Sequence, residues 1–459
     1  MYGSIEQAAR LPRSRLQVIR VSRTALWAVV ATLIGFYVML PSGQAASPLE
    51  RATRPQAAGP HCDQDNGGIN LPAGLCATVF ADNLGLARHL TVTGSGTVYV
   101  HLEASMGGGA TVALRDTTGD GRADQVKRFG DAAGTGIGIL GDYLYVSSDT
   151  RVLRYRLPKM GLVPQGAPEV VIGGFPAQSQ HTAKPLTFDE SGHLYINIGA
   201  PSNACQREDR AKGSPGMDPC PLLKKHGGIW RFDARKTGQQ AYADGVRFAT
   251  GLRNIVALQW NDQVNRLYAV QMGRDQLTQL FPQLYTPEQS AKLPAEEFFV
   301  VQQGDNFGWP YCYYDWIKDK KVLSPEYGGN GKKVGYCDQF KDPIMAFPGH
   351  WSPMDLVFYY GDLLPARYRK GAFIAFHGSW NRAPKPQAGY KVAFVPFKGG
   401  APNGDYQAFA TGFAGEKVVL YPGTARFRPS GLAVGPDGSL YIADSVQGRI
   451  WRVIPRPGG

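Results

Sequence analysis

The stretch HLTVTGSGTVYVHLEA (residues 89–104) indicates the fold class. An apolar strand is followed by a Gly-Ser-Gly turn and then by a second strand rich in β-branched and aromatic residues. Alternating strands joined by such a turn are typical of an antiparallel β-hairpin. The pattern returns five more times, in residues 136–157, 185–200, 254–273, 368–380 and 431–453. Six copies at intervals of roughly 60 residues predict repeated sheets stacked side by side.

We therefore expect an all-β chain forming a six-bladed β-propeller with long loop insertions. A seven-bladed propeller or a two-sheet sandwich stays open at this point. The 57 Gly and 33 Pro among 459 residues fit many tight turns and argue against a helical bundle. The long insertions are residues 201–226 and 276–353. In the second, Pro294 predicts the first turn of a short helix, with Glu296 and Glu297 in that turn.

The amino-terminal region has the pattern of an export signal. Five arginines precede an uncharged run over residues 25–40, and small residues follow up to Ala46. This run is shorter than the ~20 residues that a spanning helix needs. We expect a signal peptide over residues 1–46, a flexible leader over 47–60 and the propeller over 61–459. The mature protein is then periplasmic or secreted with no stable membrane span, and an uncleaved membrane anchor is the alternative.

The net charge of +12 divides between the signal and the domain. Residues 1–46 hold five Arg and one Glu, a net charge of +4, which leaves +8 for the remainder. No block of Lys and Arg remains that would follow a phosphate backbone, so we expect no nucleic-acid partner.

The six cysteines fall in three local pairs: Cys62 with Cys76, Cys205 with Cys220, and Cys312 with Cys337. Six cysteines allow fifteen pairings, of which the local one is the simplest. Disulfides would agree with export. The chain has no Cys-x-x-Cys or His-Glu-x-x-His motif, so neither zinc nor an attached haem is expected.

The hairpin pattern also predicts where a site lies. The start of each first strand and the end of each second strand lie at the same end of an antiparallel pair. In a propeller that end is one face around the central channel. Polar residues gather at these positions: Arg88, His181, Arg253, Asn254, Arg426 and Arg428 before first strands, and Gly273, Arg274, Asp275, His377, Trp380 and Arg382 after second strands.

Arginines converging from four blades predict a polyanionic ligand, because a guanidinium can pair with a carboxylate through two hydrogen bonds. Trp309 and Trp380 could stack on a flat aromatic ligand. Ordinary core packing is the alternative for both.

Four motifs carry a family resemblance: GLRNIVAL (251–258), GDNFGWPYCYYD (304–315), FHGSWNR (376–382) and RFRPSGLAVGPDG (426–438). With His181, they make the chain resemble the quinoprotein sugar dehydrogenases of the glucose/sorbosone dehydrogenase family, most closely the sorbosone-dehydrogenase-like branch. The resemblance runs from about residue 70 to the end. It implies a six-bladed propeller that binds pyrroloquinoline quinone and calcium and oxidises an aldose or sugar aldehyde at its anomeric or aldehyde carbon. An external acceptor would take the electrons.

The resemblance also implies roles for individual residues. His181 would be the catalytic base. Arg253, Asn254, Arg426 and Arg428 would contact the quinone, and His377, Trp380, Arg382 and Arg88 would complete its pocket. Gly273, Arg274 and Asp275 would form the calcium site, with backbone oxygens from the first two. The glucose-oxidising branch has Pro at the position of Arg274, and Lys where this chain has residues 377–382.

Three alternatives remain open. DTTGDGRAD (116–124) resembles a calcium loop in its spacing of Asp116, Asp120 and Asp124, or is a plain hairpin turn.

A calcium-dependent propeller lactonase is an alternative function. It needs a cation held by several acidic side chains, whereas the residues expected at this face are mostly cationic. A non-catalytic binding scaffold is the third possibility.

Overall fold

The computed structural model describes residues 61–415 and 417–457. The expected signal peptide (1–46) and leader (47–60) lie outside these residues. Strands make up most of the regular structure, and they form six sheets of four or five strands and one two-stranded hairpin.

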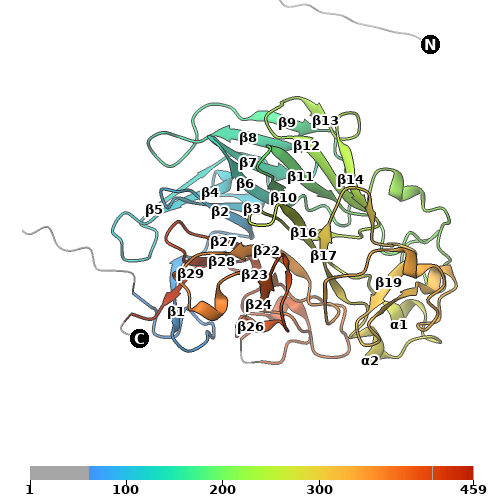
Figure 1. Cartoon of the computed structure of the whole chain (residues 1–459). Helices are drawn as coiled ribbons and strands as arrows, with labels where there is room; N and C mark the ends of the chain where they lie inside the picture. The colour runs from blue at the N-terminus through green and yellow to red at the C-terminus, as the bar shows by residue number, and fades with distance from the viewer. Residues whose placement is uncertain (1–60, 416, 458–459) are drawn as a thin grey trace, which may run out of the picture. The chain divides into compact units, whose positions relative to one another are not determined.

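The six sheets follow one another along the chain as the blades of a propeller (Figure 1). Blade one has β2 (Ala87–Val92), β3 (Val98–Met106), β4 (Gly109–Arg115) and β5 (Gln125–Phe129). Blade two has β6 (Gly134–Leu140), β7 (Tyr143–Ser148), β8 (Val152–Arg156), β9 (Glu169–Gly173) and β13 (Gln239–Gln240). Blade three has β10 (Leu186–Phe188), β11 (His193–Ile198), β12 (Gly228–Asp233), β14 (Val246–Thr250) and β18 (Asp305–Asn306).

The other three blades complete the series. Blade four has β15 (Ile255–Asn261), β16 (Arg266–Gln271), β17 (Glu296–Val301) and β21 (Met345–Phe347). Blade five has β22 (Pro353–Tyr359), β23 (Gly371–Phe376), β24 (Lys391–Lys398), β25 (Ala401–Pro402) and β26 (Gln407–Ala410). Blade six has β27 (Pro429–Val434), β28 (Leu440–Asp444), β29 (Ile450–Pro455) and β1 (Leu75–Ala81).

The ring of blades is closed in two ways. The innermost strands β2, β6, β10, β15, β22 and β27 each contact the next in this order, and β27 contacts β2. In blade six the first strand of the domain pairs antiparallel with the last, with Ala77 opposite Val453, so β1 lies beside β29 in Figure 1. The expected six-bladed propeller is confirmed, and the seven-bladed and sandwich alternatives are excluded.

Aromatic side chains fill the spaces between neighbouring blades. Trp451 of β29 is fully buried and meets Phe413 and Phe427 edge-on, with ring centroids 5.3 and 5.1 Å apart. Edge-to-face contacts of this kind add to the stabilisation from burial. An aromatic residue of the third strand of blade six thus packs against the connection between blades five and six.

The prediction of a short helix beginning at Pro294 is wrong. Residues from Glu296 onward form β17, with Glu297 opposite Gln271 of β16. Both acidic side chains are buried and find partners in the interior: Glu296 accepts two backbone N–H groups, and Glu297 pairs with Lys321 at 2.8 Å. The first-turn interpretation assumed solvated carboxylates, and tertiary pairing replaces that solvation. Part of the expected 276–353 insertion therefore belongs to blade four.

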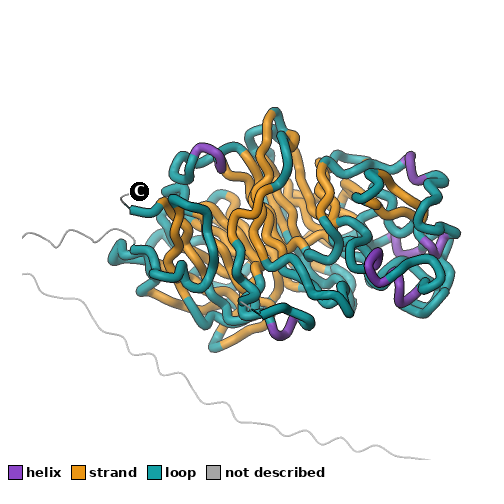
Figure 2. The backbone as a smooth tube through the Cα atoms, turned by 90° about the horizontal axis from the view of Figure 1, so that it is seen from below, coloured by secondary structure: helices purple, strands orange, loops and turns teal. Residues whose placement is uncertain are grey.

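The helical turns lie at the periphery, whereas strands fill the middle of the domain (Figure 2). They are α1 (Leu277–Leu280), α2 (Pro287–Ser290), η1 (Pro221–Lys224), η2 (Pro325–Tyr327), η3 (Cys337–Gln339), η4 (Ala366–Tyr368) and η5 (Pro422–Thr424). Within residues 61–415 and 417–457, no helix has the length and apolarity needed to cross a bilayer. The hairpin of β19 (Cys312–Asp315) and β20 (Lys320–Leu323) lies in the second insertion.

The three expected disulfides, Cys62–Cys76, Cys205–Cys220 and Cys312–Cys337, are confirmed. The 116–124 loop is a hairpin turn whose carboxylates face its own backbone. Asp116 accepts hydrogen bonds from Thr118 N and Gly121 N at 3.1 and 2.8 Å. Across the described residues, no group of three or more His, Cys, Asp or Glu side chains could hold a metal ion.

Candidate active site

A cavity of about 200 Å³ lies at one end of the inner strands. Its walls come from the segments just before first strands and just after second strands, the places where the hairpin geometry predicts a site. The lining residues are His181, Arg253, Asn254, Met272, Gly273, Asp275, Glu296, His350, Ser352, Gly378, Ser379, Trp380 and Arg428. Seven of the twelve predicted site residues, drawn from blades three to six, therefore meet at one cavity.

His181 is held as a neutral base. Its Nδ1 lies 2.5 Å from the carbonyl oxygen of Ala200, so Nδ1 carries the proton and Nε2 keeps its lone pair. Burial lowers the pKa of His181 to about 3, and the positive charge of Arg253 adds to this. Gly199 makes the close approach possible, because a Cβ there would lie 2.6 Å from the carbonyl oxygen of His181.

Arg253 is almost fully engaged by the protein. Its Nε donates to Asn203 O at 3.1 Å and its Nη1 to Gly273 O at 2.9 Å. Its Nη2 donates to Asn203 Oδ1 at 3.1 Å and to Asp275 Oδ2 at 2.7 Å. The expected two-bond pairing with a ligand carboxylate is therefore not available in this arrangement, because Asp275 already holds that position.

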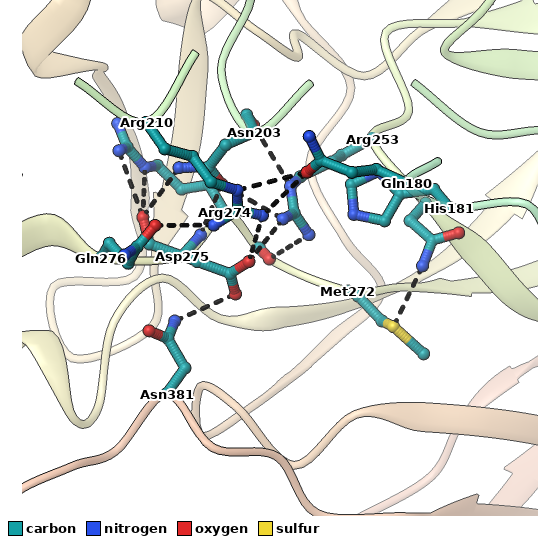
Figure 3. Close-up of polar contacts among 12 residues, drawn as sticks. Gln180, His181, Asn203, Arg210, Arg253, Met272, Arg274, Asp275, Gln276 and Asn381 are labelled. Carbon is teal, nitrogen blue, oxygen red and sulfur yellow. Dashed lines mark hydrogen bonds and ion pairs between the residues drawn. The ribbon is translucent and has the colours of Figure 1, made fainter. Parts of the chain in front are cut away.

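Asp275 is the centre of the network in Figure 3. Beside Arg253, it accepts Arg210 Nη2 at 2.9 Å and, on Oδ1, the amide of Asn381 at 3.0 Å. Burial alone would raise its pKa, but Arg253 and Arg210 hold the pKa of this carboxyl below its usual range. Asp275 is thus a carboxylate at any ordinary pH.

Glu296 is a second cavity carboxyl, and sequence analysis placed it in a helix. Its two oxygens accept Gly273 N and Ser352 N at 2.9 and 3.0 Å. Burial raises its pKa to about 7, with a further contribution from the Asp275 charge. The position of Glu296, at the start of a strand that follows a Pro, was the only signal that could have found it.

Arg428, His377 and Arg88 lie on another side of the site. Arg428 donates through Nε to His377 O at 3.1 Å and through Nη2 to Gly378 O at 2.6 Å. The His377 ring lies behind the cavity, with Nε2 2.6 Å from Ser445 Oγ. Burial and the charges of Arg428 and Arg88 hold the pKa of His377 well below its usual value. The Arg88 guanidinium lies 3.4 Å from Glu103, and its buried Nε has no partner among the described residues.

Besides Arg88 and His377, three predicted side chains do not line the cavity. Arg426 is exposed in a separate groove with Asp65 and Gly415, because the chain turns between it and Arg428. Arg382 turns away to the carbonyl oxygens of Pro386 and Ala291. Arg274 forms a buried ion pair with Glu326 of the second insertion.

Trp309 and Trp380, the two predicted stacking residues, lie in different environments. Trp309 is a core residue whose Nε1 donates to Asn203 O at 3.0 Å. Trp380 lines the cavity and is 46% exposed. Only Trp380 is therefore placed to stack on a ligand.

The backbone around the cavity is unusual. Twelve non-glycine residues of the described chain have a positive φ, and five of them line the cavity or belong to the hydrogen-bond network of Asp275 and Arg210: His181, Arg210, Gln276, His350 and Ser352. Such conformations are unfavourable for residues with a Cβ and persist where the surrounding contacts impose them, often at functional sites.

The fold and cavity together define a six-bladed propeller with a buried cluster of titratable side chains on one face. The sequence profile of the TrAA12-like family matches residues 69–456, and the chain belongs to this family. The predicted resemblance to quinoprotein sugar dehydrogenases is confirmed at this level, whereas the sorbosone-dehydrogenase-like branch stays a prediction.

Solved structures share the fold. The PQQ domain of a pyranose dehydrogenase from Coprinopsis cinerea superposes with a TM-score of 0.66 and 18% identity, over 87% of this chain and 99% of that one. A carbohydrate-active enzyme of family AA12 from Trichoderma reesei gives a TM-score of 0.68 and 20% identity, over 88% and 100%. A pyrroloquinoline quinone-dependent pyranose dehydrogenase from Coprinopsis cinerea is 29% identical over 194 residues, which are 36% of this chain and 25% of that protein. The chain spans between a quarter and a half of the length of the curated relatives it matches.

Proposed function

We propose that the protein is a sugar dehydrogenase that uses pyrroloquinoline quinone and calcium, with His181 as the base. The observation that carries this is a neutral imidazole with Nε2 unprotonated, in a cavity that also holds Arg428, Asp275 and Glu296. Family membership and the quinone-dependent relative support the cofactor.

The residues present fit a flat, multiply charged cofactor. Arg428 spends Nε and Nη2 on backbone oxygens, and the described residues offer no acceptor to its Nη1. Asn254 lines the cavity with a buried Oδ1 that has no hydrogen-bond partner within residues 61–415 and 417–457. Trp380 presents an exposed ring. These groups would hold a carboxylate, a polar ring edge and a ring face respectively. Arg88, with its unpartnered Nε, is the next cation behind them.

The oxygen donors fit calcium, which prefers carboxylates and carbonyls. Asp275 and Glu296 face the same cavity, and the carbonyl of Gly273 is beside them. Burial and the Asp275 charge raise the pKa of Glu296, and a bound divalent cation would stabilise its ionised form. Asp275 and Gly273 keep their predicted role in this proposal, and Glu296 replaces Arg274.

The reaction needs a proton acceptor next to the sugar hydroxyl. His181 Nε2 is that acceptor, since Nδ1–H is fixed on Ala200 O. Because Arg253 and Arg210 neutralise Asp275, this carboxylate does not take the proton. When bound, pyrroloquinoline quinone would supply the hydride acceptor and calcium would supply Lewis-acid polarisation. Loss of the hydride and the proton converts an aldose to its lactone, or a hydrated sugar aldehyde to its acid.

The finer predictions complete the proposal. The substrate is an aldose or a sorbosone-like sugar aldehyde, and an external acceptor reoxidises the cofactor. The protein is exported to the periplasm or secreted, which the three disulfides support.

A lactonase is the second candidate, because Asp275, Glu296 and Asn254 could hold a catalytic cation without a quinone. One experiment separates these two and the non-catalytic scaffold. The purified mature chain is given pyrroloquinoline quinone and calcium, and reduction of an artificial dye is followed with a panel of aldoses. Quinone-dependent reduction supports the dehydrogenase. Lactone hydrolysis without quinone supports the lactonase, and neither activity leaves the scaffold.

A further inference from the structure

We infer that Arg210, in the first insertion, is a positioning residue that fixes the His181 segment relative to Asp275. This rests on the proposed role of His181 as the base. No feature of the sequence repeat marks Arg210, which lies between Cys205 and Cys220 in a loop outside the blades.

The Arg210 guanidinium joins three segments (Figure 3). Its Nε and Nη2 donate to Gln180 Oε1 at 3.2 and 3.1 Å. Its Nη1 donates to Gln276 Oε1 at 2.7 Å and its Nη2 to Asp275 Oδ2 at 2.9 Å. Gln180 directly precedes His181, and Asp275 follows the end of β16. Arg210 therefore connects the residue before His181 with the carboxylate of Asp275.

Gln180 is held at both ends of its amide. Oε1 accepts from Arg210, and Nε2 donates to Asp209 Oδ2 at 2.9 Å. Asp209 is itself fixed, because its Oδ1 accepts Ser202 Oγ at 2.6 Å and Asn203 N at 2.9 Å. Asp209 and Arg210 belong to one loop that is closed by a disulfide, and together they hold the Gln180 amide in a single orientation.

The backbone on both sides of this clamp is left-handed. His181 has a φ of 54° and Arg210 a φ of 60°. Residues with a Cβ leave such conformations unless contacts hold them. The hydrogen bonds of Arg210 help to hold the His181 turn, together with Gln178 Nε2, which donates to the carbonyl oxygens of Gln180 and His181 at 2.6 and 3.0 Å. Their loss should therefore loosen this segment.

Arg210 is not placed to bind the substrate itself. Four of its five N–H groups are spent on protein acceptors, although 26% of its side chain is exposed. The planar fork suits these three partners, whereas one lysine ammonium cannot reach all of them.

The test compares Arg210→Met, Arg210→Lys and the control Arg207→Met, whose arginine is exposed in the same loop. Hydrogen exchange of the quinone-free chain over residues 178–183 should be several-fold faster in Arg210→Met, slightly faster in Arg210→Lys and unchanged in Arg207→Met. With quinone, calcium and sugar, Arg210→Met should lower kcat roughly 10- to 100-fold, with a much smaller change in KM. Melting temperatures identify any variant that is globally unfolded, in which case Arg210→Lys carries the test.

A double variant with Gln180→Met tests the route. If Arg210 acts through Gln180, the double variant should be no slower than Arg210→Met, so the two effects should not add. Wild-type exchange and wild-type turnover in Arg210→Met would overturn the proposal while leaving the dehydrogenase intact. A wild type without quinone-dependent turnover would overturn the dehydrogenase, and the exchange comparison would still decide whether Arg210 holds this segment.

Discussion

The two ends of the central channel differ in size and in chemistry. The hollow opposite the candidate site has a volume of about 500 Å³, against about 200 Å³ for the site cavity. Its walls are mainly aliphatic residues at the far ends of the inner strands, such as Leu90, Ile139 and Val434. Its carboxylates are Asp189, Glu190 and Asp262.

The two cavities differ in how their buried carboxylates are paired. At the opposite end, Asp189 is satisfied locally by His193 Nδ1 at 2.7 Å and Tyr195 OH at 3.0 Å. At the site, Asp275 is shared by arginines from two segments far apart in the chain. Volume is therefore a poor guide to function here, and the cost of burying charge is a better one.

The largest expected difference between the two ends concerns their histidines. His181→Ala should lower kcat about 1,000-fold, because it removes the proposed proton acceptor, while quinone binding should persist. His193→Ala, at the opposite end, should keep kcat within about twofold. Steady-state kinetics and fluorescence titration with quinone measure both. Near-normal kcat in His181→Ala would mean that another group is the base.

Removing the charge of Asp275 should lower the free energy of unfolding much more than removing a carboxylate charge at the opposite end of the channel. Asp275→Asn leaves Arg253 buried without its counter-ion, and should cost about 3 kcal/mol of unfolding free energy. Urea unfolding of the quinone-free chain gives this value. A loss below 1 kcal/mol would show that Asn203 and the carbonyl oxygens suffice to hold Arg253.

The pH dependence of stability should also reflect the site. His181 is neutral in the fold down to a pKa of about 3, whereas its unfolded pKa is near 6.5. The unfolded chain thus binds the extra proton first, and this residue makes stability fall as the pH drops from about 6.5 towards 3. Relative to the wild type, His181→Gln should therefore be about 3 kcal/mol more stable at pH 4 than at pH 8. Equal effects at both pH values would mean that His181 is protonated in the fold.

The smallest effect is expected at Asp262. Burial and the nearby charges of Glu190 and Asp189 raise its pKa, so the charged form is disfavoured in the fold. Asp262→Asn removes this repulsion and should change stability by no more than about 0.5 kcal/mol, in the stabilising direction. A clear loss of stability in thermal unfolding would show that the Asp262 carboxylate makes a stabilising contact in the folded protein.

The sequence by itself determined the six blades, the three local disulfides and the face that carries the candidate cavity. The blade count follows from a local repeat of alternating strands, and the disulfides from short separations such as the 14 residues between Cys62 and Cys76. The face follows because a hairpin returns its chain to the end where it began. These are properties of neighbouring residues, so a local pattern encodes them.

Only the tertiary structure decided which charges meet. The Asp275 carboxylate pairs with Arg253, where a ligand carboxylate was expected. Glu296 begins a strand, and Arg426 lines a different groove from the cavity that Arg428 lines. Arg210 and Asn203 reach the site from an insertion without any repeat signal. The physical reason is that the partner of a buried charge is set by desolvation and by contacts between distant segments, which the order of residues along one strand does not contain.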